Sequence, residues 1–149
     1  MLPHETITAV INSANEAKGI ALIPFITAGY PDKENFVETL SLISQVGDVV
    51  EIGVPFSDPM ADGMTIQRSS YKAIQAGVTL QWIFEQLNLI KDRVSAPLVM
   101  MSYLNPLLAF GFDALAERAV DTGVCAFIVP DLPLEESIEL STSLDRKGI

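Results

Sequence analysis

The chain has 149 residues, of which 49% are hydrophobic and 19% charged, enough apolar side chain for one domain with a buried core. Its 9 lysines and arginines against 19 aspartates and glutamates give a net charge of −10, which disfavours binding to nucleic acid phosphates. A single cysteine excludes an internal disulfide, and no apolar run approaches the roughly 20 residues of a membrane span. With no secretory signal at the N-terminus, these features predict a soluble, cytoplasmic protein.

Four short apolar runs predict the strands of a parallel sheet. None of them alternates polar with apolar residues, which indicates that both faces of each strand are covered. In chain order the runs are residues 20–26, 49–53, 98–101 and 126–129.

Helical patterns precede, separate and follow these runs. Asp32 is a candidate N-cap for the helix after the first run, and Gly47 ends that segment. Gly123 ends the helix before the fourth run. The predicted helices cover residues 6–17, 36–43, 65–75, 80–90, 112–120 and 133–144.

Strand–helix alternation with short connections predicts βαβ units and a right-handed parallel sheet. The midpoints of the runs, Leu22, Val50, Val99 and Phe127, are 28, 49 and 28 residues apart, so the second unit carries an insertion of about twenty residues. In a (β/α) barrel such an insertion lies at the C-terminal face, where active sites form. The rival fold, a doubly wound open sheet, would need a glycine-rich phosphate turn after its first strand, and residues 27–31 contain only one glycine.

A complete (β/α)8 barrel, or TIM barrel, takes about 250 residues. The chain is therefore predicted to be an α/β protein with an N-terminal helix and the first four βα units of such a barrel, forming a single domain over residues 1–149. Either the sequence is a truncated piece or the half-barrel pairs with a partner. Four strands alone would have two open edges and would expose side chains such as Leu22 and Val50.

Glu51 is the first candidate for catalysis, because it is a carboxylate in an otherwise apolar strand end. Burial there would raise its pKa towards neutrality, which suits a general acid and base. The alternative is an ordinary strand-end glutamate that is solvated or paired with an arginine.

Asp58 and Asp62 lie in the polar segment before the next helix. Two carboxylates at one barrel mouth would suit acid–base catalysis. The simpler interpretation makes Asp62 a helix N-cap and Asp58 a turn former. The spacing of the two residues alone does not decide between this interpretation and a catalytic role.

Other catalytic groups are scarce. The only histidine, His4, is predicted to be a solvated helix-start residue, so neither a Ser–His pair nor a transition-metal site is expected. No lysine ends an apolar run, which disfavours a Schiff base. Cys125 is predicted to be a buried structural thiol. What remains is carboxylate acid–base chemistry on a substrate that carries its own electron sink.

The segment from Glu51 to Gly63, EIGVPFSDPMADG, resembles the signature of the tryptophan synthase α subunit family. Matches at residues 24–31, 63–67, 101–106 and 130–135 extend the resemblance over essentially the whole chain. Met64 and Ser102, where the family often has Pro and Thr, are minor departures, and the absence of everything after the fourth helix is the major one. The resemblance implies a (β/α)8 barrel lyase of tryptophan biosynthesis.

In that family the α subunit cleaves indole-3-glycerol phosphate to indole and glyceraldehyde 3-phosphate by a retro-aldol reaction. The resemblance implies that Glu51 protonates C3 of the indole and takes a proton from the glycerol hydroxyl. It implies that Asp62 stabilises the positive charge that develops at the indole N–H. The positions that resemble the indole pocket are Phe25, Met101, Tyr103 and Ile128. Plain barrel core would explain the same four side chains.

The resemblance also implies a partner, the pyridoxal-phosphate β subunit of an α2β2 tetramer. Pro55, Asp58 and Pro133 resemble the contact face, and no cofactor or metal is expected in this chain. The phosphate-binding loops after strands seven and eight and the mobile loop after strand six are absent from it. Two other functions stay open, an inactive fragment that binds a partner and a related barrel lyase acting on another phosphorylated substrate.

Overall fold

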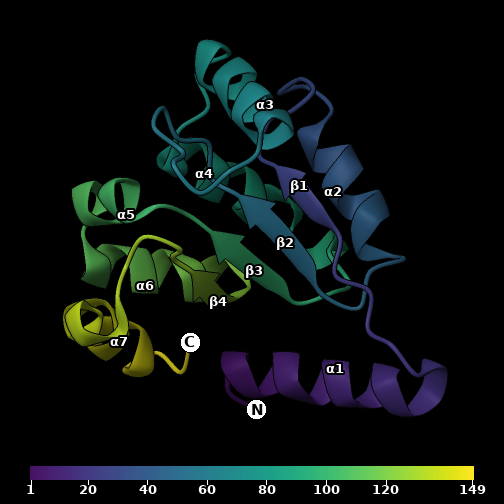
Figure 1. Ribbon diagram of the computed structural model, residues 1–149. Coiled ribbons are helices and arrows are strands. Elements are labelled where there is room, and N and C mark those ends of the chain that lie inside the picture. Colours follow the sequence, from purple (N-terminus) through teal and green to yellow (C-terminus); the bar gives the residue numbers. More distant parts are fainter.

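The computed structural model describes all 149 residues and contains a four-stranded parallel sheet in the order β1-β2-β3-β4 (Figure 1). Neighbouring strands are parallel throughout, so β1 and β4 are the two edges. The predicted α/β class and parallel sheet are confirmed. The strands are β1 (Phe25–Thr27), β2 (Val50–Gly53), β3 (Leu98–Met101) and β4 (Val124–Ile128).

Helices alternate with the strands, and α4 packs between α2 and α6 on one face of the sheet. In Figure 1, α1 crosses beneath the N-terminal ends of the strands, and it contacts β4. None of the helices is both long enough and apolar enough to span a membrane. The α-helices are α1 (Pro3–Lys18), α2 (Phe36–Ser44), α3 (Met64–Gln75), α4 (Leu80–Ile90), α5 (Leu104–Phe110), α6 (Phe112–Thr122) and α7 (Ile138–Asp145). Two 3-10 helices are η1 (Lys91–Arg93) and η2 (Leu134–Glu136).

The register of the strands places alternate residues in rows on opposite faces of the sheet. On the face that the helices cover, Ile26, Ile52 and Met100 form one row, and Val50, Leu98 and Val124 form the next. All six are at most 8% exposed, so this face is the core of the domain. The burial of Val50 corrects the expectation that it would be exposed. Leu22, which precedes β1, is 50% exposed as expected.

The first strand is shorter than its apolar run. Regular pairing begins at Phe25, one residue after Pro24, which has no N–H to donate to a neighbouring strand. Ile20 and Ile23 are 70% and 45% exposed, so the prediction that both faces of this run are buried is wrong for its first half.

The fourth strand begins two residues before its predicted run. Gly123 ends α6 in the left-handed conformation, φ 79°, and the chain enters β4 at the next residue. Gly123 was predicted to stop this helix, and that prediction is confirmed. Cys125 is half-buried rather than fully buried, and its thiol lies 3.4 Å from the Gly123 carbonyl oxygen.

Three helical segments differ from the sequence-based expectations. The N-cap of α2 is Asn35, and Asp32 instead accepts a hydrogen bond from the Asn35 N–H at 2.9 Å. The helix expected over 133–144 is divided into η2 and α7 at Ser137, whose hydroxyl donates to the Leu134 carbonyl oxygen at 2.8 Å. Helix α5 was not expected from the sequence. Pro106 lies in the first turn, where a missing N–H costs nothing.

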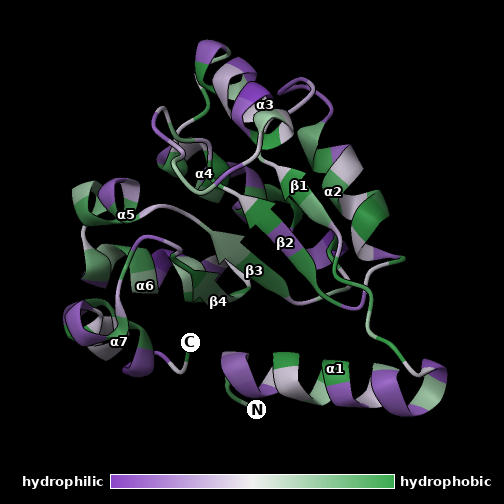
Figure 2. Ribbon diagram, in the orientation of Figure 1, coloured by the Kyte–Doolittle hydropathy of each residue, from purple (hydrophilic) through white to green (hydrophobic).

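The predicted insertion after β2 is α3, which packs beside β1 at the C-terminal ends of the strands (Figure 1). Much of α3 is hydrophilic in Figure 2, in contrast to the largely hydrophobic strands. A buried hydrogen bond of 2.7 Å between the hydroxyls of Thr27 and Ser69 joins β1 to α3. The insertion is therefore fixed to the sheet at the end where an active site is expected.

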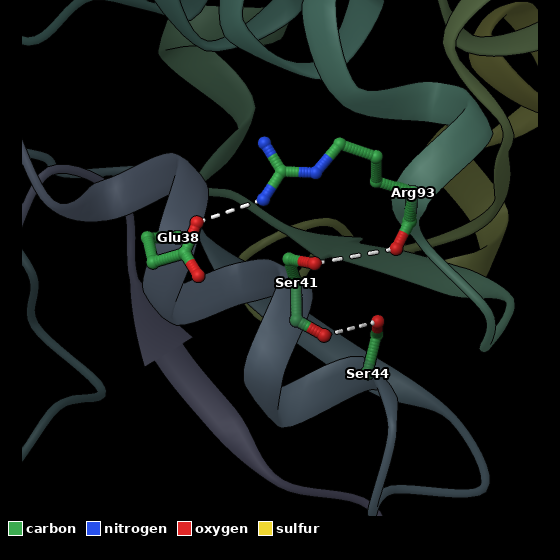
Figure 3. A network of polar contacts seen from close by, with 4 residues as sticks. All are labelled: Glu38, Ser41, Ser44 and Arg93. Carbon is green, nitrogen blue, oxygen red and sulfur yellow. Dashed lines mark hydrogen bonds and ion pairs between the residues drawn. The ribbon is translucent and has the colours of Figure 1, made fainter.

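A polar network fastens α2 to η1 (Figure 3). Arg93 donates from its guanidinium to the Glu38 carboxylate at 2.7 Å, and the Ser41 hydroxyl donates to the Arg93 carbonyl oxygen at 3.3 Å. Ser41 and Ser44 are 4% and 2% exposed, and the Ser44 hydroxyl donates to the Ser41 carbonyl oxygen at 2.8 Å. Because each hydroxyl has a partner, burying them costs little.

The two ends of the chain meet through His4. Its ring nitrogen Nδ1 lies 2.8 Å from the Gly148 carbonyl oxygen, and its backbone N–H donates to the same oxygen at 3.2 Å. Helix α1 is thereby tied to the residues after α7 (Figure 1). His4 is exposed and lies in the first turn of α1, as expected, and its ring also makes this contact with Gly148.

Candidate active site

The face of the sheet opposite the helix-covered core carries the residues singled out from the sequence. Phe25, Glu51, Val99 and Ala126 form one row across all four strands. Thr27, Gly53, Met101 and Ile128 form the next row towards the C-terminal ends. Phe25, Glu51, Met101 and Ile128 come from four separate segments of the sequence and lie on the same face.

Glu51 stands near the middle of this face, with Phe25 on one side and Val99 on the other. Its backbone N–H donates to the Pro24 carbonyl oxygen at 2.9 Å, which fixes the strand, while its half-buried carboxylate makes no hydrogen bond or ion pair. Burial raises the pKa of the Glu51 carboxyl above its ordinary value. Glu51 is therefore not paired with an arginine, and its role as general acid and base stays a prediction beside that of a solvated strand-end glutamate.

Phe25 packs against the backbone of Gly53. A Cβ added at Gly53 would lie 2.8 Å from Cε2 of the Phe25 ring and closer still to Cζ. Only glycine leaves room for the ring in this position, which places an apolar surface beside Glu51.

Asp62 lies in the loop between β2 and α3. Its N–H donates to the Pro59 carbonyl oxygen at 3.1 Å, and its own carbonyl oxygen accepts from the side-chain amide of Gln67 at 2.8 Å. The N-cap of α3 is Gly63, so the interpretation of Asp62 as an N-cap is wrong. Burial raises the pKa of the Asp62 carboxyl, and hydrogen bonding with the Tyr103 hydroxyl opposes that rise.

Tyr103 follows β3 and is only 2% exposed. Its hydroxyl accepts a hydrogen bond of 2.9 Å from the Ala61 N–H, in the same loop as Asp62. Its ring stacks on Phe56, with the ring centroids 5.2 Å apart and the planes 28° from parallel. The structure thus brings Tyr103 to Asp62, an arrangement that the sequence does not reveal.

The three predicted contact positions lie in loops at the C-terminal ends of the strands. Asp58 and Pro133 are exposed, whereas Pro55 is buried and shapes the loop from within. The Asp58 carbonyl oxygen accepts from the Met60 N–H at 2.9 Å, which confirms its role in a turn.

Two polar residues of this region escaped the sequence-based reasoning. The Asp131 carboxylate accepts a hydrogen bond of 2.9 Å from the Leu104 N–H and so joins the loop after β4 to the start of α5. A carboxylate two residues after an apolar run is the signal that could have found it. Gln67 gave no such signal, because nothing in a helical pattern shows that a glutamine reaches back to the preceding loop.

The sequence is similar to known proteins over almost its whole length. A family model described as tryptophan synthase alpha chain matches residues 11–149. The chain is 47% identical over 135 residues to the tryptophan synthase alpha chain of Nitratidesulfovibrio vulgaris strain Hildenborough, with 90% of this chain and 52% of the relative covered. It is 46% identical over 149 residues to that of Solidesulfovibrio magneticus, with 99% and 58% covered. The chain spans about half the length of the curated relatives it matches.

Solved structures show the same relationship. The tryptophan synthase subunit alpha of Legionella pneumophila strain Paris superimposes with a TM-score of 0.88 at 32% identity, over 100% of this chain and 56% of that one. The ligand-free tryptophan synthase of Mycobacterium tuberculosis gives a TM-score of 0.89 at 30% identity, over 96% and 58%. The predicted fold, the first four βα units of a (β/α)8 barrel, is confirmed.

Proposed function

The chain belongs to the tryptophan synthase alpha chain family, and from this membership we propose that it supplies the acid–base half of a lyase active site in tryptophan biosynthesis. The reaction is the retro-aldol cleavage of indole-3-glycerol phosphate to indole and glyceraldehyde 3-phosphate. The observation that carries the proposal is the Glu51 carboxyl, which is half-buried, has no partner and has a raised pKa on the uncovered face of the sheet.

Glu51 acts first as an acid. Its proton goes to C3 of the indole, and the ring becomes an iminium-like cation whose positive charge is shared with the nitrogen. A carboxyl of raised pKa is protonated in a larger fraction of molecules near neutral pH, which favours this step.

Glu51 then acts as a base. The carboxylate takes the proton of the glycerol hydroxyl next to the ring, the oxygen forms a carbonyl, and the carbon–carbon bond to the ring breaks. The bonding electrons return to the indole and cancel its positive charge. Glu51 is protonated again at the end, so one residue serves both steps.

Asp62 is the second catalytic residue of the proposal. Its carboxylate stabilises the positive charge at the indole N–H, a charge that develops only as C3 is protonated. The apolar surface for the indole ring comes from Phe25, Met101, Tyr103 and Ile128. Three of them lie in the two rows of the uncovered face, and Tyr103 lies two residues after the end of β3.

The partner in this proposal is a tryptophan synthase β subunit that carries pyridoxal phosphate and forms an α2β2 tetramer with the complete α subunit. The loops after β2 and β4 present Asp58 and Pro133 to solvent, and Pro55 supports the first loop from inside. The structural relative from Mycobacterium tuberculosis is a tryptophan synthase, which supports this choice of partner.

The test uses a chimera in which this chain is joined to the remaining C-terminal part of the Solidesulfovibrio relative. We expect the chimera to release indole from indole-3-glycerol phosphate and Glu51→Gln to lower kcat by at least about 100-fold, the usual scale for one acid–base group. The control is Glu34→Gln, which makes the same chemical change at an exposed residue of the β1–α2 loop. A folded Glu51→Gln chimera with the turnover of the parent would refute the assignment.

The other candidate functions give different results in the same assay. A related lyase would leave indole-glycerol phosphate intact and cleave another phosphorylated substrate. A binding fragment would show no cleavage, either alone or in the chimera, yet would co-purify with a β subunit.

A further inference from the structure

The loop that carries Asp62 is held from outside its own segment. Where the loop begins, the Val54 N–H donates to the Met101 carbonyl oxygen of β3 at 2.8 Å. Next to Asp62, the Ala61 N–H donates to the Tyr103 hydroxyl at 2.9 Å, across 42 residues of sequence. Ala61 directly precedes Asp62, so the tyrosine oxygen helps to fix the aspartate backbone.

Tyr103 is itself rigid. Its side chain is 2% exposed and its ring stacks on Phe56. Its backbone is fixed on both sides, since the Ser102 hydroxyl donates to the Tyr103 carbonyl oxygen at 2.9 Å and the Leu104 N–H donates to Asp131 at 2.9 Å. A hydroxyl on such a ring can serve as a fixed reference point for the loop.

The Tyr103 hydroxyl still has a proton to donate, because its oxygen accepts the Ala61 N–H. Asp62, the residue after Ala61, carries a carboxylate that can accept that proton. The Tyr103 hydroxyl lowers the pKa of Asp62 by hydrogen bonding, against the rise caused by burial. Burial raises the pKa of Tyr103 itself, the Ala61 N–H opposes that rise, and the charges of Asp62 and Asp131 add to it.

We propose that Tyr103 is a positioning residue for Asp62, which holds the aspartate loop through Ala61 and keeps the carboxylate ionised and oriented by donating its hydroxyl proton. This inference rests on the proposed function for its catalytic meaning. The proposal gives the Tyr103 hydroxyl a function, whereas a residue that only lined the indole pocket would use its ring alone. Burial and Tyr103 are the two influences on the Asp62 carboxyl, and Asp131 is the other charged group that faces the tyrosine.

The first test is a carbon-detected NMR titration of Asp62 in the chimera, with the signal assigned from Asp62→Asn. A carboxylate that accepts two or three hydrogen bonds has its pKa lowered by about two units, so one bond corresponds to about 0.5–1 unit. Tyr103→Phe should therefore raise the Asp62 midpoint by about that amount. The control, Tyr71→Phe, removes the hydroxyl of an exposed tyrosine on α3 and should leave it unchanged.

The second variant keeps the ring and the hydroxyl in place. Site-specific replacement of Tyr103 by 3-fluorotyrosine in the chimera makes the hydroxyl a stronger donor and should lower the Asp62 midpoint. Shifts in opposite directions for the two replacements support the proposal, since a merely structural role would not reverse its sign. An unchanged midpoint in folded Tyr103→Phe, or a fluorotyrosine shift upward, overturns it.

The chimera gives the catalytic readout. Tyr103→Phe should lower kcat more than it raises KM, and the acidic limb of the kcat profile should move to higher pH in step with the Asp62 titration. If the chimera cleaves no indole-glycerol phosphate, the proposed function fails, while the titration still decides the role of Tyr103. If kcat falls and the Asp62 midpoint stays in place, Tyr103 is only a wall of the pocket and the proposal is wrong.

Discussion

Gly53→Ala tests whether the Phe25 ring lies where the structure places it, over the backbone of β2. The new Cβ would lie 2.8 Å from Cε2 of Phe25 and closer still to Cζ, whereas carbon atoms in contact sit about 3.5–4.0 Å apart. The ring must therefore move back by about 1 Å. Gly53 is not among the glycines with positive φ, so alanine can adopt its backbone conformation.

Two free-energy changes of opposite sign determine the expected magnitude. Overpacking costs about 1–3 kcal/mol, and because Phe25 is half-buried on an uncovered face we expect the lower part of that range. Alanine in a strand interior is more favourable than glycine by roughly 0.5–1 kcal/mol, because the unfolded chain loses less entropy on folding. The net destabilisation should be about 1 kcal/mol.

The decisive assay is a double-mutant cycle with Phe25→Ala. Without the ring, Gly53→Ala loses its clash and keeps only the gain of about 0.5–1 kcal/mol, so its sign should reverse. Urea unfolding of the chimera, followed by far-UV circular dichroism at matched protein concentrations, measures all four free energies. The coupling should be about 1–2 kcal/mol, well outside the roughly 0.3–0.5 kcal/mol scatter of independent sites. Equal effects of Gly53→Ala in both backgrounds would refute the placement of the ring.

Three further predictions concern the two carboxylates and the sheet edges. Burial raises the folded-state pKa of Glu51 above its unfolded value, so the contribution of Glu51 to stability is present below the unfolded pKa and is lost as pH rises through the folded pKa. Glu51→Gln should therefore raise the urea midpoint at neutral pH and make the free energy of unfolding fall less steeply with pH. A lower urea midpoint would contradict this prediction. Asp62→Asn in the chimera should lower kcat more than it changes KM, because the charge it stabilises belongs to the transition state, and a change in KM alone would make Asp62 a positioning residue. The 149-residue chain in solution should self-associate or remain loosely packed, because β1 and β4 are unpaired edges, and should release no indole; light scattering that reports a compact monomer, or normal activity, would show this reasoning to be wrong.

The sequence by itself determined the four strands, most of the helices and the order in which they occur. Apolar runs without alternation located β2 and β3 to within one residue. The prediction that both faces of these strands are covered is wrong, because the helices cover only one face of the sheet. Glycine also marked helix ends such as Gly123. A helix that ends in the left-handed conformation favours glycine, and this preference is a property of the local backbone. Glu51 was also identified from local sequence, since a carboxylate in an apolar strand end is unusual wherever the strand lies.

Local sequence was less informative where a neighbour in space decides the outcome. Leu22 and Val50 are both apolar residues of apolar runs, yet one is 50% exposed and the other 0%, because Val50 lies on the helix-covered face of β2 whereas Leu22 precedes β1 outside the sheet. Pro55 and Asp58 belong to one motif, and the packing of the loop buries the first and exposes the second.

Only the tertiary structure decided how the site is assembled. The row that joins Phe25 to Glu51 is set by the parallel register of β1 and β2, which no single segment encodes. The Tyr103 hydroxyl accepts a hydrogen bond from the Ala61 N–H, 42 residues away in the sequence. The two residues are close because β2 and β3 pair in parallel, so the loops that follow these strands lie side by side. Periodicity reports which face of an element is apolar, whereas contacts between loops depend on the summed geometry of every strand and turn between them. The carboxylates could therefore be named from the sequence, and the groups that hold them in place could not.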